Sequence, residues 1–366
     1  MMIPPPDVDN ISTWYLSDGA IRRRLLILHR LAELISGIHS FGFTFGDLSP
    51  KNIFVSMDKK YHEVQLIDCD NMTPCGSVTG EIFYTRKYGA PEIVRDKVEY
   101  STLTDAWSFA VIAYQLLTLR HPLIGDMVNE GEVELEEKAL RGEFPWVEDG
   151  DDNSNLCSTG LPSELVALKP LRALFHKTFS GTKDPWTRPE ILEWHDVLQR
   201  CLYAFYKCDQ CGEYFIYTPK PVCPFCKKNK TGGYVVLKFA RWEPEADVGY
   251  RIRSPRSFRL PKVLLNRGES FIVDQDYHLQ DDFKLEINFD AEKDRLSLLL
   301  KEASDTKNVL IRKKVDDDID ISKEATLVPN RLMNIPKIEK DRHYSIHFGD
   351  LETPHRIITF IWKGAS

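Results

Sequence analysis

The N-terminal part of the chain carries apolar residues at helical spacing. Between residues 20 and 40 apolar side chains recur every three or four positions, which predicts an amphipathic helix with one buried face. These residues are Ile21, Leu25, Leu28, Ala32, Ile35 and Ile38. The stretch from Asp105 to Leu119, DAWSFAVIAYQLLTL, is apolar nearly all round and predicts a helix at the centre of a helical domain. Further helical pattern continues to about Tyr206.

Patterns typical of strands occur in two other places. The run IFVSMDKKYHEVQLID, which begins at Ile53, reads as two short strands with a polar turn at Asp58 to Lys60. Beyond the linker-like KKNKTGG, apolar and polar residues alternate. In FKLEINF the residues on one face are Phe283, Leu285, Ile287 and Phe289. Together with YVVLKF, SFIV, LSLLL, NVLIR, YSIHF and RIITFIW, this alternation predicts a β-sandwich or barrel.

Four of the eight cysteines have the spacing of metal ligands. CDQC and CPFC form two Cys-x2-Cys pairs separated by eleven residues, and their cysteines are Cys208, Cys211, Cys223 and Cys226. In a chain without an export signal, two such pairs indicate four thiolates on one tetrahedral zinc; disulfides or a redox pair are the alternatives. The β-prone GEYFIYTPKP between them suits the hairpin of a zinc ribbon. Four protein ligands leave no position for water, so the zinc is expected to be structural.

These patterns predict a multidomain α+β protein. We expect a mainly helical domain over residues 1–206, a small zinc ribbon over 207–230 and a β-rich sandwich over 234–366. A length of 366 residues is sufficient for two or three domains that each bury a core.

The composition is typical of a globular protein and limits the classes of partner that the protein is expected to bind. Hydrophobic residues make up 42% of the chain and charged residues 28%, as in soluble domains. No run approaches about 18 uncharged apolar residues, and MMIPPPDVDN lacks the basic start of a signal peptide, so we expect a cytoplasmic protein that does not enter a membrane. The net charge is -7, with acid concentrated between Asp126 and Asp152. This balance disfavours nucleic acid, because a phosphate backbone attracts a basic surface.

The segment GDLSPKN, residues 46–52, suggests a catalytic loop. It sets Asp47 five positions before Asn52, and LIDCD places Asp68 directly after the second strand of the hairpin. The order helix, Asp-x4-Asn loop, hairpin and LID resembles the C-terminal lobe of eukaryotic-type protein kinases. The resemblance implies that Asp47 is the catalytic aspartate and that Asn52 and Asp68 hold magnesium on the phosphates of ATP.

Three later motifs extend the resemblance, which runs from about Arg22 to Leu202. GAPE gives Glu92 the role of the glutamate that closes the activation segment. TDAWSFAVIAYQLL resembles the following helix, in which Asp105 would cap and pin the catalytic loop. DPWTRPEILEW supplies Arg188, which in this family pairs with that glutamate. A lone aspartate is usually a turn or cap residue, but five motifs in the order of the family indicate kinase ancestry.

Several positions depart from the family pattern. Phe45 and Gly46 stand where the family usually has His and Arg, so the arginine that meets a phosphorylated activation loop is absent. Ser49 replaces the catalytic-loop lysine, and Cys69 and Asp70 replace the Phe and Gly that follow the metal-binding aspartate. These changes either lower activity or mark a divergent subfamily. The chain combines GDLSPKN, RHPLIGD and the cysteine pairs. In this combination it resembles bacterial kinase-like proteins that are often found beside von Willebrand A-type and metal-dependent phosphatase partners.

The residues before Asp47 contain neither a Gly-rich phosphate loop nor the lysine of a VAIK-like strand. We therefore expect that the N-terminal nucleotide lobe is missing from the chain and that MMIPPP, residues 1–6, is a remnant of the hinge. An internal methionine taken as the start, a fragment and a short gene product are the open explanations. Half a nucleotide site is expected to leave the chain inactive by itself.

Three classes of function remain. The first is a serine/threonine kinase that, when complete, phosphorylates protein hydroxyls. The second is a pseudokinase or scaffold that binds a protein substrate or regulatory partner without turnover. A small-molecule phosphotransferase is disfavoured, because GAPE and the Asp105 helix build the peptide shelf of protein kinases. The C-terminal sandwich permits a forkhead-associated-like reader of phosphothreonine, with Arg267 as a candidate, although that family's motifs are not recognisable; a plain interaction domain is the alternative.

Overall fold

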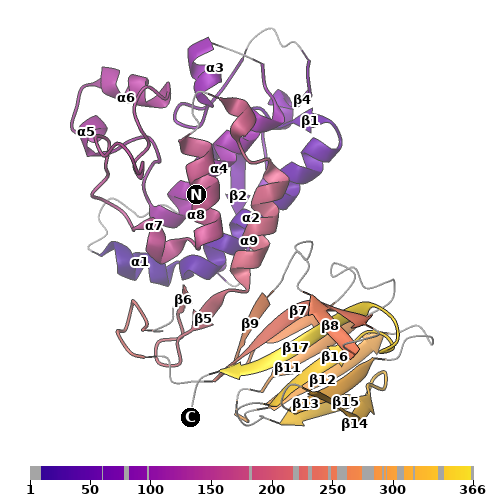
Figure 1. The fold of residues 1–366 in the computed structure, drawn as a ribbon. Helices are drawn as coiled ribbons and strands as arrows, with labels where there is room; N and C mark the ends of the chain where they lie inside the picture. The colour runs from indigo at the N-terminus through magenta and orange to yellow at the C-terminus, as the bar shows by residue number, and fades with distance from the viewer. Residues whose placement is uncertain are drawn as a thin grey trace. The chain divides into compact units, whose positions relative to one another are not determined.

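The computed structural model divides the chain into two compact units, which we describe separately (Figure 1). The first comprises Met1–Leu202 with Glu213–Ile216, and the second Tyr203–Gly212 with Tyr217–Ser366. The predicted hinge remnant at residues 1–6 lies outside the described residues. The structure describes residues 10–363 apart from 60, 78–81, 97–98, 181–183, 217–221, 230–232, 246–248, 254–261, 274–283, 291, 294, 303–308, 316–317 and 337–341.

The first unit is organised around α4 (Thr102–Thr118), which is buried nearly all round, as its sequence predicts. The helix begins at a capping box. The Ser101 hydroxyl accepts a hydrogen bond from the Thr104 amide, and the Thr104 hydroxyl accepts one from the Ser101 amide. Two orphan amides at the helix start are thereby satisfied, so α4 begins at a defined residue.

Helices α2 (Ala20–Ser40), α8 (Lys169–Phe179) and α9 (Ile191–Leu202) pack against α4 (Figure 1). The predicted apolar face of α2 is buried, with Ile38 near its end half-buried. Most of the elements in this unit are helices, as the sequence pattern predicts. The remaining helices of the unit are α1 (Ile11–Ser17), α3 (Pro91–Asp96), α5 (Asp126–Asn129), α6 (Val133–Leu140) and α7 (Ser163–Val166).

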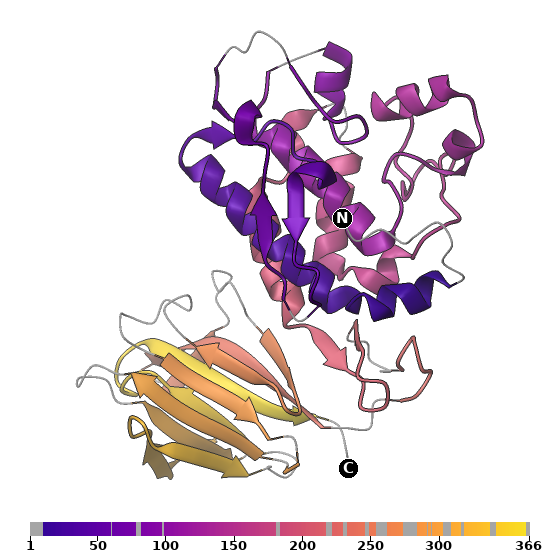
Figure 2. The same cartoon turned by 180° about the vertical axis from the view of Figure 1, so that it is seen from behind.

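Two small antiparallel sheets stand beside these helices. Strands β2 (Ile53–Val55) and β3 (Val64–Leu66) form the predicted hairpin (Figure 2). Strand β1 (Phe43–Thr44) pairs with β4 (Thr73–Pro74), so the segments before and after the hairpin lie together. The short 3-10 helices of this unit are η1 (Pro50–Asn52), η2 (Cys69–Asn71) and η3 (Pro185–Thr187), and its last strand is β6 (Tyr214–Ile216).

The second unit contains two antiparallel sheets that share one hydrophobic core. In β11 the side chains of Leu285, Ile287 and Phe289 are buried in alternation, as predicted, while Phe283 lies outside the described residues. The smaller sheet has the order β10 (Ser270–Val273), β11 (Lys284–Phe289), β12 (Arg295–Glu302), β15 (Leu332–Pro336). The larger sheet has the order β14 (Asp318–Thr326), β13 (Leu310–Val315), β16 (Arg342–His347), β17 (His355–Lys363), β7 (Tyr234–Glu245), β8 (Gly249–Arg253), with β9 (Lys262–Asn266) also paired to β7. The unit also contains β5 (Phe205–Lys207).

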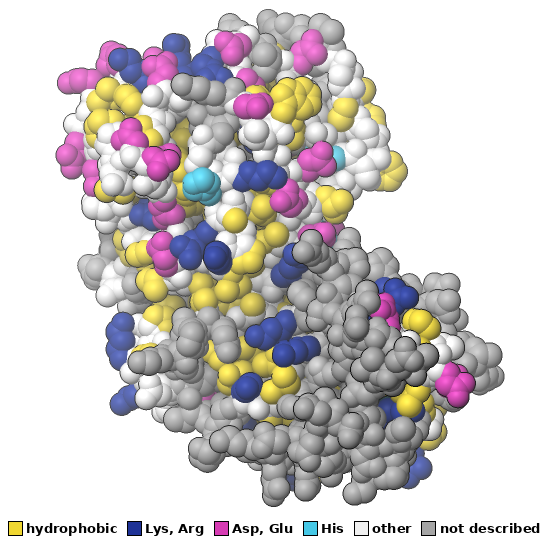
Figure 3. Space-filling view, viewed as in Figure 1, with side chains coloured by type: hydrophobic (Ala, Val, Ile, Leu, Met, Phe, Trp, Pro, Cys, Tyr) yellow, Lys and Arg dark blue, Asp and Glu magenta, His cyan; other side chains and the backbone are white. Residues whose placement is uncertain are grey.

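The surface of the first unit is acidic over α5 and α6, which the acid-rich stretch of the sequence forms. Side chains of Asp and Glu gather on this part of the face shown in Figure 3. In the described part of the chain, no helix combines the length and the apolar character that crossing a membrane requires.

Candidate active site

The loop before Asp47 is anchored by a single buried carboxylate. Asp105, near the start of α4, is fully buried, and its oxygens accept hydrogen bonds from the amide of Phe45 at 2.7 Å and the amide of Gly46 at 3.0 Å. The His39 ring lies 2.9 Å from the same carboxylate through Nε2. Because a buried carboxylate is costly unless its oxygens are paired, these contacts fix the loop to the central helix.

Gly46 is required by the backbone that this anchoring imposes. Its φ is +84°, in the left-handed region that side chains disfavour. A Cβ at this position would also lie 2.8 Å from the carbonyl oxygen of Asn71 and 3.4 Å from Cε2 of Tyr100. The glycine that replaces the arginine of the kinase pattern therefore relieves strain and gives room to both neighbours.

Asp47 follows directly and is engaged through both carboxylate oxygens. The Thr85 amide donates to Oδ1 at 2.8 Å, and the Thr85 hydroxyl donates to Oδ2 at 3.1 Å. From the other side, Nδ2 of Asn52 donates to the Asp47 carbonyl at 2.9 Å. Asp47 and Asn52 are thus brought together as the motif implied. Sequence reasoning missed Thr85, because nothing in its neighbourhood separates it from other hydroxyl residues.

Asp68 lies beyond β3 in a left-handed conformation, with φ 57° and ψ 58°. The amide of the preceding Ile67 donates to the Asn52 carbonyl at 3.0 Å, which ties the two segments together. Such a conformation costs a non-glycine residue of order 1–3 kcal/mol and is concentrated at functional sites. The Asp68 side chain is exposed. A carboxylate and the remaining amide oxygen of Asn52 are oxygen donors of the kind that magnesium prefers, so the donor set fits this ion.

Glu92 in α3 and Arg188 form a buried, bidentate ion pair. Their two hydrogen bonds measure 2.6 Å and 2.7 Å, and the Arg188 side chain is fully buried. Arg188 also donates to the Leu103 carbonyl and lies over the Trp107 ring, 4.8 Å from its centroid. The segment that ends at α3 is therefore held to the start of α4 and to the residue that follows η3.

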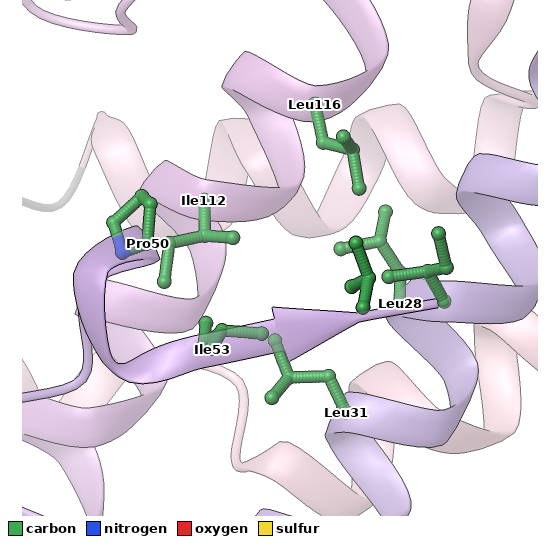
Figure 4. Close-up of a pocket in the computed structure, with 8 residues that line it drawn as sticks. Leu28, Leu31, Pro50, Ile53, Ile112 and Leu116 are labelled. Carbon is green, nitrogen blue, oxygen red and sulfur yellow. The ribbon is translucent and has the colours of Figure 1, made fainter. Parts of the chain in front are cut away.

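A small apolar pocket with a cavity volume of about 20 Å³ lies between α2, α4 and β2 (Figure 4). On β2, Ile53 and Val55 line it, whereas Phe54, which alternates with them, is 57% exposed. Sequence reasoning read IFV only as a strand and missed this exposed ring. The lining residues are Ile27, Leu28, Leu31, Pro50, Ile53, Val55, Ile112 and Leu116.

The positions that depart from the kinase pattern have distinct environments. Ser49 is fully buried, and its hydroxyl has no hydrogen-bond partner among the described residues. It therefore does not present a donor where the family has a lysine. Cys69 and Asp70, which follow Asp68 in η2, are exposed.

The four predicted metal ligands lie together in the second unit, and all four are free thiols rather than disulfides. The Sγ atoms of Cys208 and Cys226 are 3.6 Å apart and those of Cys211 and Cys223 are 3.7 Å apart. Four thiolates at about 2.3 Å from one zinc would be separated by about 3.8 Å, so the donor set fits a tetrahedral zinc. Burial opposes ionisation of Cys208, but the amides of Cys211 and Gln210 outweigh it and lower its pKa to about 7.

Comparison with known proteins finds similarity to protein kinases in part of the chain. Residues 16–170 match the family described as the protein kinase domain. Maternal embryonic leucine zipper kinase of Xenopus tropicalis is 24% identical over 50% of this chain and 29% of its own length. Serine/threonine-protein kinase pkn2 of Myxococcus xanthus is 32% identical over 29% of this chain and 13% of its own length. Mitogen-activated protein kinase p38b of Drosophila melanogaster is 33% identical over 31% of this chain and 30% of its own length.

The chain therefore spans less than a third of the length of these relatives. Among solved structures, the granulovirus kinase PK-1 of Cydia pomonella is similar with a TM-score of 0.34 and 19% identity, covering 47% of this chain and 56% of that chain.

Proposed function

We propose that the first unit is the lower lobe of a serine/threonine protein kinase that phosphorylates protein hydroxyls once a nucleotide lobe completes it. The observation that carries this proposal is the environment of Asp47. A threonine hydroxyl lies 3.1 Å from one of its oxygens, on a loop that the buried Asp105 holds in place. The match of residues 16–170 to the protein kinase domain supports the same reading.

Asp47 is suited to orient an acceptor hydroxyl and take its proton. The Thr85 contact shows that a hydroxyl fits within hydrogen-bond distance of this carboxylate. Asn52 uses Nδ2 on the Asp47 carbonyl, which leaves its amide oxygen to join Asp68 as a magnesium ligand. Magnesium and ATP, when bound, supply the phosphoryl group and neutralise its charge. The exposed Phe54 offers an apolar surface for the planar base of the nucleotide.

The test is a radiolabelled phosphate-transfer assay on two proteins, the chain as it stands and the same chain extended upstream through a nucleotide lobe. We expect negligible transfer by the first and transfer to serine or threonine by the second. Asp47→Asn should abolish transfer by the extended protein. The matched control is Asp151→Asn, because Asp151 is an exposed loop residue of the same charge. Transfer that persists in Asp47→Asn contradicts the proposal.

A pseudokinase scaffold is the second candidate, and the buried Ser49 hydroxyl favours it. Ser49 carries no charge at the position where the family has a lysine, so this position offers no cation to the transferring phosphate. The extended protein would then bind its protein partners without turnover. An inactive extended protein that retains a Gly-rich loop and its lysine would support the scaffold.

For the remainder of the chain, we propose a structural zinc ribbon over residues 207–230 and an interaction β-sandwich over residues 234–366. The spacing of the four sulfur atoms supports the first, and the two sheets with a common core support the second. A reader of phosphothreonine that uses Arg267 is a narrower hypothesis for the sandwich. Candidate partners are proteins, including phosphatases and von Willebrand A-type proteins, rather than nucleic acid or a membrane, and the cytoplasm is the proposed compartment.

A further inference from the structure

Tyr100 connects two segments of the candidate active site that the sequence motifs leave unconnected. It lies directly before Ser101, the capping residue of α4, and is 6% exposed. Its hydroxyl donates a hydrogen bond to the carbonyl oxygen of Phe83. Phe83 is two residues before Thr85, so this bond holds the segment whose amide and hydroxyl engage Asp47.

The ring of Tyr100 lies against the catalytic loop. A Cβ on Gly46 would be 3.4 Å from Cε2 of Tyr100, so the ring lies close beside Gly46. Gly46 precedes Asp47, and Asp105 holds its amide. The same side chain therefore lies beside the loop that carries Asp47 and is bonded to the segment that carries Thr85.

We infer that Tyr100 is a positioning residue that holds Thr85 on the Asp47 carboxylate through a neutral hydrogen bond, so that this arrangement requires no phosphate on the segment. Gly46 makes the contact possible, because a side chain there would meet both the ring and the Asn71 carbonyl. The consequence for catalysis rests on the proposed function, whereas the coupling of Tyr100 to Thr85 does not.

The hydroxyl of Tyr100 is suited to this role because it remains a donor. Burial raises its pKa, and the carboxylates of Asp47 and Asp105 raise it further. An uncharged hydroxyl also avoids placing a second negative charge beside these two carboxylates.

Tyr100→Phe tests the inference in the full chain, because it removes the donor and keeps the ring. We expect hydrogen exchange of the peptide that contains Thr85 to become about threefold to tenfold faster, as for the loss of one hydrogen bond. Exchange in α4 and the thermal midpoint of the unit should change little. Treatment with a phosphatase should leave the exchange of the unmodified chain unchanged.

Tyr15→Phe is the matched control. Tyr15 is also buried in the first unit, but its hydroxyl has no hydrogen-bond partner among the described residues. Exchange at Thr85 should therefore not respond to it. Unchanged exchange in Tyr100→Phe, or an equal change in both variants, overturns the inference, as does faster exchange after phosphatase treatment.

Activity of the extended protein separates this inference from the proposed function. If it transfers phosphate, Tyr100→Phe should lower kcat while the KM for ATP stays within about twofold. A fall in kcat is expected because Asp47 loses its fixed orientation. If the extended protein is inactive but exchange at Thr85 responds as expected, the proposed function fails and the positioning role stands.

Discussion

Arg188 and Glu92 are 96 positions apart in the sequence and form two parallel hydrogen bonds, Nη1 to Oε1 at 2.6 Å and Nη2 to Oε2 at 2.7 Å. Both side chains are buried, so neither charge can be solvated if its partner is removed. The pair joins α3, at the end of the segment that engages Asp47, to Arg188, which also contacts the start of α4 through the Leu103 carbonyl.

Arg188→Ala should reduce the free energy of unfolding of the first unit by about 3 kcal/mol or more, because it leaves the Glu92 carboxylate buried and unpaired. The measurement is urea denaturation. Arg172→Ala is the control, since the Arg172–Glu164 pair is largely exposed and its loss should cost less than about 1 kcal/mol. Equal effects of the two substitutions would contradict the role assigned to burial.

Gly46→Ala should destabilise the first unit by about 1 kcal/mol or more, because the residue has a φ of +84° and a Cβ would lie 2.8 Å from the Asn71 carbonyl. Gly37→Ala is the matched control. Gly37 lies within α2, and a Cβ there would meet nothing within 4 Å. It should stabilise the helix by about 0.5–1 kcal/mol. Thermal denaturation of both variants tests whether their effects have opposite signs.

Removal of Cys208 should eliminate zinc binding. The purified chain is expected to contain one zinc, whereas Cys208→Ser should contain far less than one and unfold more readily in the second unit, because binding and folding of such sites are coupled. Metal analysis by mass spectrometry measures the zinc. Cys75→Ser serves as the comparison, since Cys75 is exposed and outside the cluster. A Cys208→Ser protein with full zinc content would refute the site.

A chain of hydrogen bonds in the second unit fixes two histidines as neutral. Nδ1 of His355 lies 2.7 Å from the Thr353 carbonyl, which can only accept, so Nδ1 carries the proton. His355 Nε2 therefore accepts from His347 Nδ1 at 2.8 Å, and His347 Nε2 accepts from the Ser345 hydroxyl at 2.9 Å. Burial, followed by the proximity of His355 and Arg312, lowers the pKa of His347 to about 3.

The second unit should consequently lose stability in acid. Above about pH 6.5 His347 is neutral in the folded and unfolded chains, so its burial does not change the free energy of unfolding with pH. Below that pH the unfolded chain binds a proton that the folded chain rejects until about pH 3. The loss is about 1.4 kcal/mol per pH unit for one histidine.

Denaturation at a series of pH values between about 7 and 4.5 measures this slope. Substitution of His347 by Gln should reduce the slope, whereas His62→Gln should not, because His62 is exposed. An unchanged slope in His347→Gln would show that this imidazole is not the group responsible.

The local sequence pattern was sufficient to predict those features that depend on residues close together in the sequence. The period of the apolar residues predicted α2 and α4, the alternation around Leu285 predicted β11, and the run after Asn52 predicted the β2–β3 hairpin. The cysteine spacing likewise placed its four thiols at one point. The helices and the strands are set by periodicity, because a helix or strand exposes one face at a fixed interval, whereas the cysteines are set by the short Cys-x2-Cys spacing.

Only the tertiary structure decided which distant side chains meet. The contact of Thr85 with Asp47, the bond from Tyr100 to Phe83 and the pairing of His347 with His355 leave no periodic signal in the sequence. The sequence by itself predicted the main helices and strands and the candidate residues for phosphate transfer and zinc binding. Packing determined the partners of those residues, because a hydrogen bond between separate segments exists only after the core has brought their backbones together.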